Sequence, residues 1–66
     1  MTLTILTELE EDGRWIGEVP ELPGVLVYGV SQRDAEMRAK VLALHVVADQ
    51  LEHGELVAVS PLIFAA

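Results

Sequence analysis

Residues 11–30 read EDGRWIGEVPELPGVLVYGV, and two turn signals inside this stretch decide the predicted fold. The first is Asp12-Gly13, which favours a tight hairpin because glycine tolerates the positive φ that such a turn requires. The second is Pro23-Gly24, a dipeptide typical of turns, whose proline is unsuited to a central strand. The stretch therefore predicts two hairpins and, with them, three consecutive antiparallel strands.

The predicted strands flank these two turns. Residues 2–11 largely alternate apolar and polar side chains, as a half-buried strand does, and residues 14–19 form the return strand. Residues 25–30 are rich in valine and predict a third strand. Residues 55–65 predict a final strand. Its nearly continuous apolar side chains are typical of strands that are covered on both faces.

A single long helix is predicted over residues 32–53. Ser31 precedes it, and the serine hydroxyl can accept a hydrogen bond from the free backbone N–H near Asp34. Gly54 is typical of the residue that follows a helix end. The whole chain, residues 1–66, is thus expected to form one domain in the order strand, strand, strand, helix, strand.

This order predicts an α+β fold in which one mixed sheet carries the helix on one face. Because the helix returns the chain, the final strand should run parallel to the first and third strands. The connection should be right-handed. The pattern leaves open whether the final strand pairs beside the first strand or beside the third.

The predicted helix has two apolar faces. The face with the larger side chains is expected to pack on the sheet: Met37, Val41, Leu44, Ala48 and Leu51. The second face and the final strand are then left uncovered, which predicts self-association, with small side chains that allow a second helix to approach closely. These candidate residues are Ala35, Ala39, Leu42, Ala43, Val46, Leu62, Ile63 and Phe64. The alternative is a monomer with a partly apolar surface.

The charge is strongly acidic, with eleven carboxylates against four basic side chains and a formal net charge of −7. Such a surface repels phosphate groups, so we expect no direct binding to nucleic acid. A basic protein is the natural partner, but acidic surfaces also serve solubility, and charge alone favours neither interpretation. Six carboxylates in the first third of the chain form the candidate partner-facing surface: Glu8, Glu10, Glu11, Asp12, Glu18 and Glu21.

No constellation of residues points to catalysis. The absence of cysteine excludes disulfides and thiolate metal sites. The spacing of His45, Asp49 and His53 would permit a weak surface metal site, but a solvated helix flank is the stronger interpretation. We expect no catalytic residue, no metal, no cofactor and no enzymatic activity. No secretory signal or membrane-spanning run is visible, which predicts a soluble, cytoplasmic protein.

The motif in residues 11–25, EDGRWIGEVPELPGV, closely resembles the amino-terminal domain of HicB-family antitoxins. The turn at Tyr28-Gly29, the serine-capped helix after it and the run in residues 43–55 also resemble that family. The resemblance covers residues 3–55. It implies a partial ribonuclease H-like fold with the strand order 3-2-1-4, in which the final strand lies beside the first.

The resemblance also implies a function. Members of this family bind and neutralise HicA toxins, which are small basic proteins of double-stranded-RNA-binding fold that cut messenger RNA with a histidine. The antitoxin is not itself a nuclease. Family members usually carry a further DNA-binding segment, which these 66 residues lack, so we expect no operator binding from them. The alternative is an orphan structural or regulatory homo-oligomer that has no toxin partner.

Overall fold

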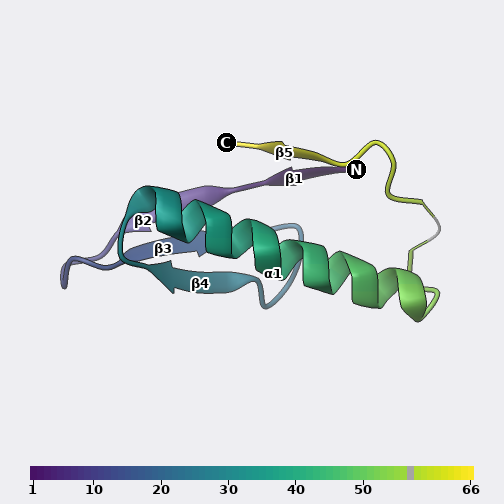
Figure 1. Ribbon diagram of the computed structural model, residues 1–66, viewed down its shortest axis with the longest axis horizontal. Helices are drawn as coiled ribbons and strands as arrows, with labels where there is room; N and C mark the ends of the chain where they lie inside the picture. Colours follow the sequence, from purple (N-terminus) through teal and green to yellow (C-terminus); the bar gives the residue numbers. More distant parts are fainter. Residues whose placement is uncertain (57) are drawn as a thin grey trace.

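The chain forms an α+β fold with five short strands and one long helix, seen in a computed structural model that describes residues 1–56 and 58–66 (Figure 1). The elements are β1 (Thr2–Thr4), β2 (Leu6–Leu9), β3 (Trp15–Glu18), β4 (Leu26–Gly29), α1 (Gln32–Glu52) and β5 (Ile63–Ala65). The predicted α+β class is confirmed. The predicted single mixed sheet is wrong, because the strands form a two-stranded sheet, β1-β5, and a three-stranded sheet, β2-β3-β4.

The two sheets arise because the first predicted strand is divided at Ile5 into β1 and β2. The register of β2 on β3 pairs Leu6 with Glu18, so its continuation would place Thr4 opposite Pro20. Proline has no N–H to donate to a ladder. The backbone N–H of Thr4 instead donates to the Glu21 carboxylate at 2.9 Å. A side chain therefore occupies the position at which backbone pairing stops.

The final strand lies beside the first, which settles the alternative that the sequence pattern left open. β5 pairs in parallel with β1 over three residues, with Leu3 opposite Phe64 at the centre. The predicted bounds of 55–65 are wrong, since the strand covers only Ile63–Ala65. Pro61 is the signal that the prediction passed over, because proline interrupts strand pairing. Residue 57, within the predicted strand, lies outside the described residues.

Both predicted turns form. The Glu10 N–H donates to the Arg14 carbonyl at 2.7 Å, and Gly13 adopts a positive φ of +90°, as the Asp-Gly pair predicts. β3 then pairs antiparallel with β2 on one side and with β4 on the other. The three antiparallel strands predicted from residues 11–30 are therefore confirmed.

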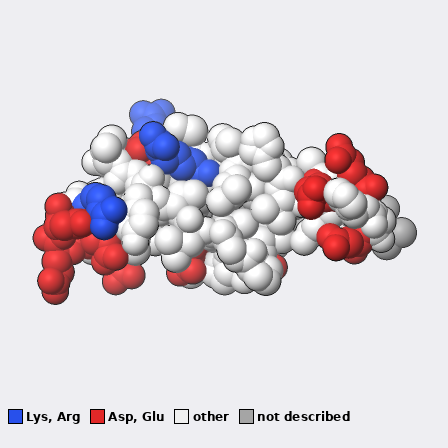
Figure 2. Space-filling view, turned by 90° about the horizontal axis from the view of Figure 1, so that it is seen from below, with Lys and Arg blue, Asp and Glu red and all other residues white. Residues whose placement is uncertain are grey.

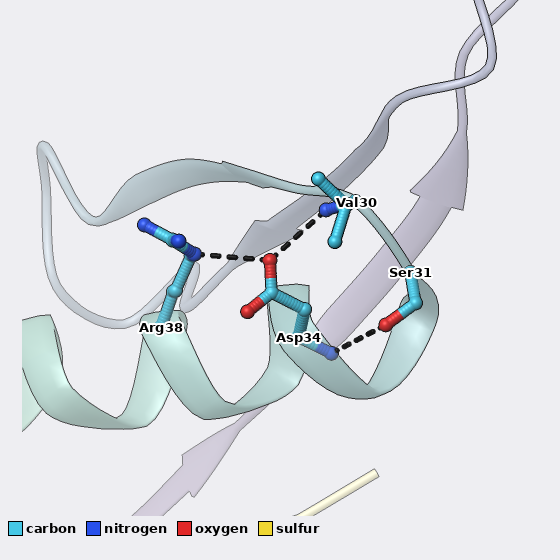
Figure 3. Close-up of polar contacts among 4 residues, drawn as sticks. All are labelled: Val30, Ser31, Asp34 and Arg38. Carbon is cyan, nitrogen blue, oxygen red and sulfur yellow. Dashed lines mark hydrogen bonds and ion pairs between the residues drawn. The ribbon is translucent and has the colours of Figure 1, made fainter.

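The helix begins as its cap residue predicts. Ser31 Oγ accepts a hydrogen bond from the backbone N–H of Asp34 at 3.0 Å (Figure 3). The Asp34 carboxylate in turn accepts bonds from the N–H of Val30 at 2.9 Å and from Arg38 Nε at 3.0 Å. The Val30 N–H, followed by the Arg38 guanidinium, holds the pKa of Asp34 below its ordinary value. The helix ends at Glu52, one residue before the predicted end.

The helix faces the sheet with its small side chains, so the predicted orientation of its two apolar faces is wrong. The buried helix residues are Ala35, Ala39, Ala43 and Val47. Glycines on the sheet explain this orientation. A Cβ on Gly17 would lie 2.5 Å from the Ala35 carbonyl oxygen, and one on Gly29 would lie 2.5 Å from the Ala35 nitrogen. The backbones approach too closely for large side chains to lie between them.

The alanines predicted to mediate self-association are therefore part of the chain's own core. Ala39 and Ala43 pack in one cluster with side chains from β1 and from the loops around residues 19–25. Leu42 and Val46 are partly buried against this cluster. The stripe predicted to pack on the sheet points away from it, and its residues are exposed: Met37, Val41, Leu44, Ala48 and Leu51.

Candidate protein-binding surface

The sheet β2-β3-β4 has one face under the helix and one face turned away from it. Successive side chains of a strand point to opposite faces. Gly17 lies against α1, and the register places Thr7 and Val27 on the same row, so these three positions face the helix. The alternate positions form the outer face: Leu6, Glu8, Ile16, Glu18, Leu26 and Tyr28. No element in the described part of the chain covers this outer face (Figure 1).

The outer face combines apolar and acidic side chains. Leu6 lies opposite Glu18, and Glu8 lies opposite Ile16, so each carboxylate has an apolar neighbour across the strand pair. These residues line a shallow hollow of about 310 Å³. On the other side of β3, Leu26 and Tyr28 are exposed. Exposed apolar side chains beside carboxylates suit a protein partner that supplies apolar and basic groups together.

The acidic turn between β2 and β3 extends this surface at one end of the molecule. Figure 2 shows acidic side chains gathered at the two ends of the long axis, and between them a mostly uncharged surface with a group of Lys and Arg side chains along one side. The turn end holds Glu10, Glu11 and Asp12, which line an open hollow of about 350 Å³. Within the described residues, no hydrogen bond or ion pair engages the side chains of Glu10 and Glu11. Their charge is therefore available to a partner.

Asp12 is already engaged within the turn. Its carboxylate accepts hydrogen bonds from the Arg14 backbone N–H at 3.0 Å and from Arg14 Nε at 2.7 Å. These two bonds hold the pKa of the Asp12 carboxyl below its ordinary value. The Arg14 guanidinium also lies 4.1 Å from the centre of the Tyr28 ring, which is a cation–π distance. Arg14 thus connects the acidic turn with the aromatic side chain of the outer face.

Glu21 does not belong to this surface, although the sequence placed it with the other five carboxylates. Its carboxylate accepts bonds from the Thr4 hydroxyl at 2.7 Å and from the Thr4 N–H at 2.9 Å. The hydroxyl first, and then the N–H, hold the pKa of Glu21 below its ordinary value. Glu21 therefore joins the loop after β3 to β1. The structure brings Glu8 and Glu18 together on the sheet and places the turn carboxylates at its end.

The candidates for self-association in the final strand are only partly available. Phe64 and Leu62 are partly buried against the core, whereas Ile63 is 50% exposed. The Lys40 ammonium lies 5.9 Å from the centre of the Phe64 ring. Ile63 alone among these three strand candidates presents an exposed apolar side chain.

The predicted histidine flank does not gather ligands. His53 Nδ1 lies 2.8 Å from the Asp49 carbonyl and 3.3 Å from its carboxylate. Across residues 1–56 and 58–66, no three or more histidine, cysteine, aspartate or glutamate side chains come together as a metal site would require. The same part of the chain contains no helix with the length and apolar character needed to span a membrane.

Sequence reasoning missed the apolar half of the candidate surface. Leu6 breaks the alternation of the first strand because it is an apolar residue on the outward row, between the inward-facing Ile5 and Thr7. In the next two strands, the alternation itself could have indicated the outer face. Ile16, Leu26 and Tyr28 all lie at the positions that alternate with Gly17 and Gly29.

The sequence was compared with protein-family models and with curated proteins, and the fold with solved structures, and no match was found.

Proposed function

We propose that this chain is a cytoplasmic, antitoxin-like binding module that masks a small basic protein. The observation that carries the proposal is the uncovered outer face of β2-β3-β4, where exposed apolar side chains alternate with carboxylates. Exposed apolar area of this kind marks interaction surfaces more than it marks ordinary surface. The acidic side chains would speed encounter with a basic partner and disfavour nucleic acid.

The class of partner comes from the motif resemblance. A HicB-like domain would cover the active surface of a HicA-type toxin, a basic protein that itself attracts RNA. The strand pairings support a partial ribonuclease H-like fold with the order 3-2-1-4 as part of the same proposal. β4-β3-β2 are paired in that order, and β1, the other half of the divided first strand, is paired with β5. The absence of a gathered metal site among the described residues is compatible with a masking role.

The first test is functional. The chain is expressed together with the protein encoded by the neighbouring open reading frame, and growth is scored with and without the chain. Rescue of growth is the expected result. If the neighbouring protein is not toxic, or if its toxicity persists, the antitoxin proposal fails and an orphan homo-oligomer becomes the better interpretation.

The second test locates the surface. The double variant Glu8→Gln/Glu18→Gln should lower the association rate about three- to tenfold and flatten its salt dependence, because the steering charge on the outer face is removed. The control Asp49→Asn/Glu55→Gln changes the net charge equally at the far end of the helix and should leave the rate nearly unchanged. Equal effects from both variants would show that only net charge matters and would exclude this face.

A further inference from the structure

The outward face of α1 carries an apolar stripe that no described part of the chain covers. Its four large side chains are each substantially exposed: Met37 51%, Val41 46%, Leu44 46% and Leu51 39%. Ala48 is also exposed within the stripe. On the opposite face of the same helix, Ala35, Ala39, Ala43 and Val47 are buried in the chain's own core. The stripe is therefore a second apolar face that the fold of one chain leaves unpartnered.

The spacing along this stripe identifies the kind of partner that fits it. The intervals between its residues are four, three, four and three, which is an average of 3.5 residues. A strict 3.5-residue repeat keeps a helix seam facing another helix, as in left-handed two-helix packing. A helix that only needed to lie on a sheet would not require this repeat, and here the repeat falls on the face turned away from the sheet.

We propose that the stripe is covered by α1 of a second copy of this chain, packed antiparallel. The charged residues beside the stripe favour a second copy of the chain as the partner, and they favour the antiparallel direction. Arg38 follows Met37, and Glu52 follows Leu51, so both charged residues lie on the same flank at opposite ends of the stripe. In an antiparallel pair, this flank of one helix lies against the same flank of the second helix, which runs in the opposite direction. Arg38 of each copy then lies against Glu52 of the other.

The same register places the apolar residues in matching layers. When Arg38 is level with Glu52 of the second copy, Val41 lies beside Leu51, and Leu44 lies beside Ala48, in each half of the symmetric pair. Such self-complementarity is what a two-fold interface requires. A parallel arrangement would bring this flank against the opposite flank of the second copy, where Arg33 and Lys40 lie, so Arg38 would meet basic residues and not Glu52. The charges therefore favour the antiparallel pair.

The fold leaves this contact accessible. The helix has 21 residues and is about 31 Å long; its N-terminal part lies on β2-β3-β4, and its C-terminal part extends beyond these strands (Figure 1). The β2 and β3 part of the outer face is on the far side of the sheet and would stay exposed in the pair, whereas Leu26 and Tyr28 on β4 line one groove with Met37 and Val41 at the border of the stripe. A domain of 66 residues has a small core, so burial of a second apolar face also adds stability.

Sedimentation over a range of roughly 1 to 100 micromolar tests the proposal, because a homodimer with a dissociation constant in this range changes from monomer to dimer across it. We expect a monomer–dimer equilibrium for the natural sequence. Leu44→Arg should raise the dissociation constant at least about a hundredfold, because a charge would enter the centre of the seam. Ile63→Arg, at an apolar residue of similar exposure on β5, should leave dimerisation unchanged. A monomer at all concentrations, or a dimer lost only in Ile63→Arg, overturns the proposal.

A charge exchange tests the direction. Arg38→Glu and Glu52→Arg should each raise the dissociation constant roughly three- to thirtyfold, since two exposed ion pairs become two repulsive contacts. The double variant restores opposite charges only in the antiparallel pair and should return the constant to near its original value. Arg38 also pairs with Asp34, so unfolding of each variant is measured separately to exclude a defect within the monomer. A double variant as weak as its parents would contradict the antiparallel arrangement.

Discussion

At the scale of single residues, two glycines determine which face of the helix lies on the sheet. Gly17 and Gly29 occupy rows of β3 and β4 directly beneath Ala35. Without side chains at these positions, the helix backbone approaches the strands closely. Only small residues fit between the backbones, so the alanines turn inward and the larger apolar residues turn outward. Two positions without a Cβ thus set the orientation of a helix of 21 residues.

Gly17→Ala tests this close approach. The added methyl group would lie 2.5 Å from the Ala35 carbonyl oxygen, which is backbone and cannot rotate away. We expect a loss of about 1 to 3 kcal/mol or more in the free energy of unfolding, measured by urea denaturation. Adding Ala39→Gly should not restore stability, because the obstacle is the carbonyl and not the Ala39 methyl group. Unchanged stability in Gly17→Ala would refute the close contact.

Glu21 provides a prediction on pH. Its pKa is below the ordinary value in the folded chain, chiefly because the Thr4 hydroxyl donates to its carboxylate. The folded state therefore favours the ionised form. The stabilisation is present above the ordinary carboxyl pKa and is lost as the pH falls through the lower folded-state pKa.

The comparison is between the natural sequence and Glu21→Gln. The variant should be less stable at neutral pH, and the difference should shrink toward zero as the pH falls below about 4 in denaturation experiments. Glu11→Gln is the control, because within the described residues no hydrogen bond or ion pair engages the Glu11 carboxylate. A stability difference for Glu21→Gln that stays constant from neutral to acid pH would show that the Thr4 contact does not depend on ionisation.

At the scale of elements, features that depend on neighbouring residues could be predicted from the sequence, and features that depend on residues far apart in the chain could not. The Asp-Gly turn, the Ser31 cap and the limits of the helix depend on residues a few positions apart, and these predictions are confirmed within a residue. The division of the first strand depends on Pro20, which comes level with Thr4 only after the hairpin has formed. Such a contact is invisible to a pattern of alternation along one strand.

The prediction of which helix face packs on the sheet was wrong for a related reason. The two predicted apolar faces of the helix have the same number of residues, and side-chain size alone favoured packing the larger residues on the sheet. The deciding information lay on other elements, in the glycines of β3 and β4. The candidate surface likewise could be predicted only in part. The acidic turn followed from consecutive residues, whereas the apolar row of the outer face required the register of three strands.

A pair of substitutions measures the orientation directly. Ala39→Leu inserts a large side chain into the fully buried contact with the sheet and should lower the free energy of unfolding by about 1 to 3 kcal/mol or more. Leu44→Gln lies on the outward stripe and should change it by no more than about 0.5 kcal/mol in the monomer. Both are measured by urea denaturation at a concentration below that at which dimers form. A larger effect for Leu44→Gln than for Ala39→Leu would restore the orientation that side-chain size suggested.

At the scale of the whole molecule, the centres of the two proposed contacts lie on opposite sides, and the contacts adjoin only along β4, where Leu26 and Tyr28 line one groove with Met37 and Val41. The stripe of α1 faces away from the sheet, and the outer face of β2-β3-β4 faces away from the helix. A dimer formed through the helices would therefore present the β2 and β3 part of both sheet faces outward, away from the seam. Binding of a partner on one copy would not obstruct binding on the other. The two contacts should behave as independent sites.

Independence of the two sites predicts the composition of the complex. With a basic partner that is itself monomeric, light scattering on the purified complex should give two copies of each protein. Leu44→Arg should reduce this to one copy of each without changing the partner's affinity, because the substituted residue is on the far side of the sheet. Tyr28→Ala on the outer face should have the opposite effect, weakening partner binding about tenfold or more while the chain still dimerises. If Leu44→Arg abolishes partner binding as well as dimerisation, the two surfaces are coupled, and the partner binds across the helix seam and not on the sheet.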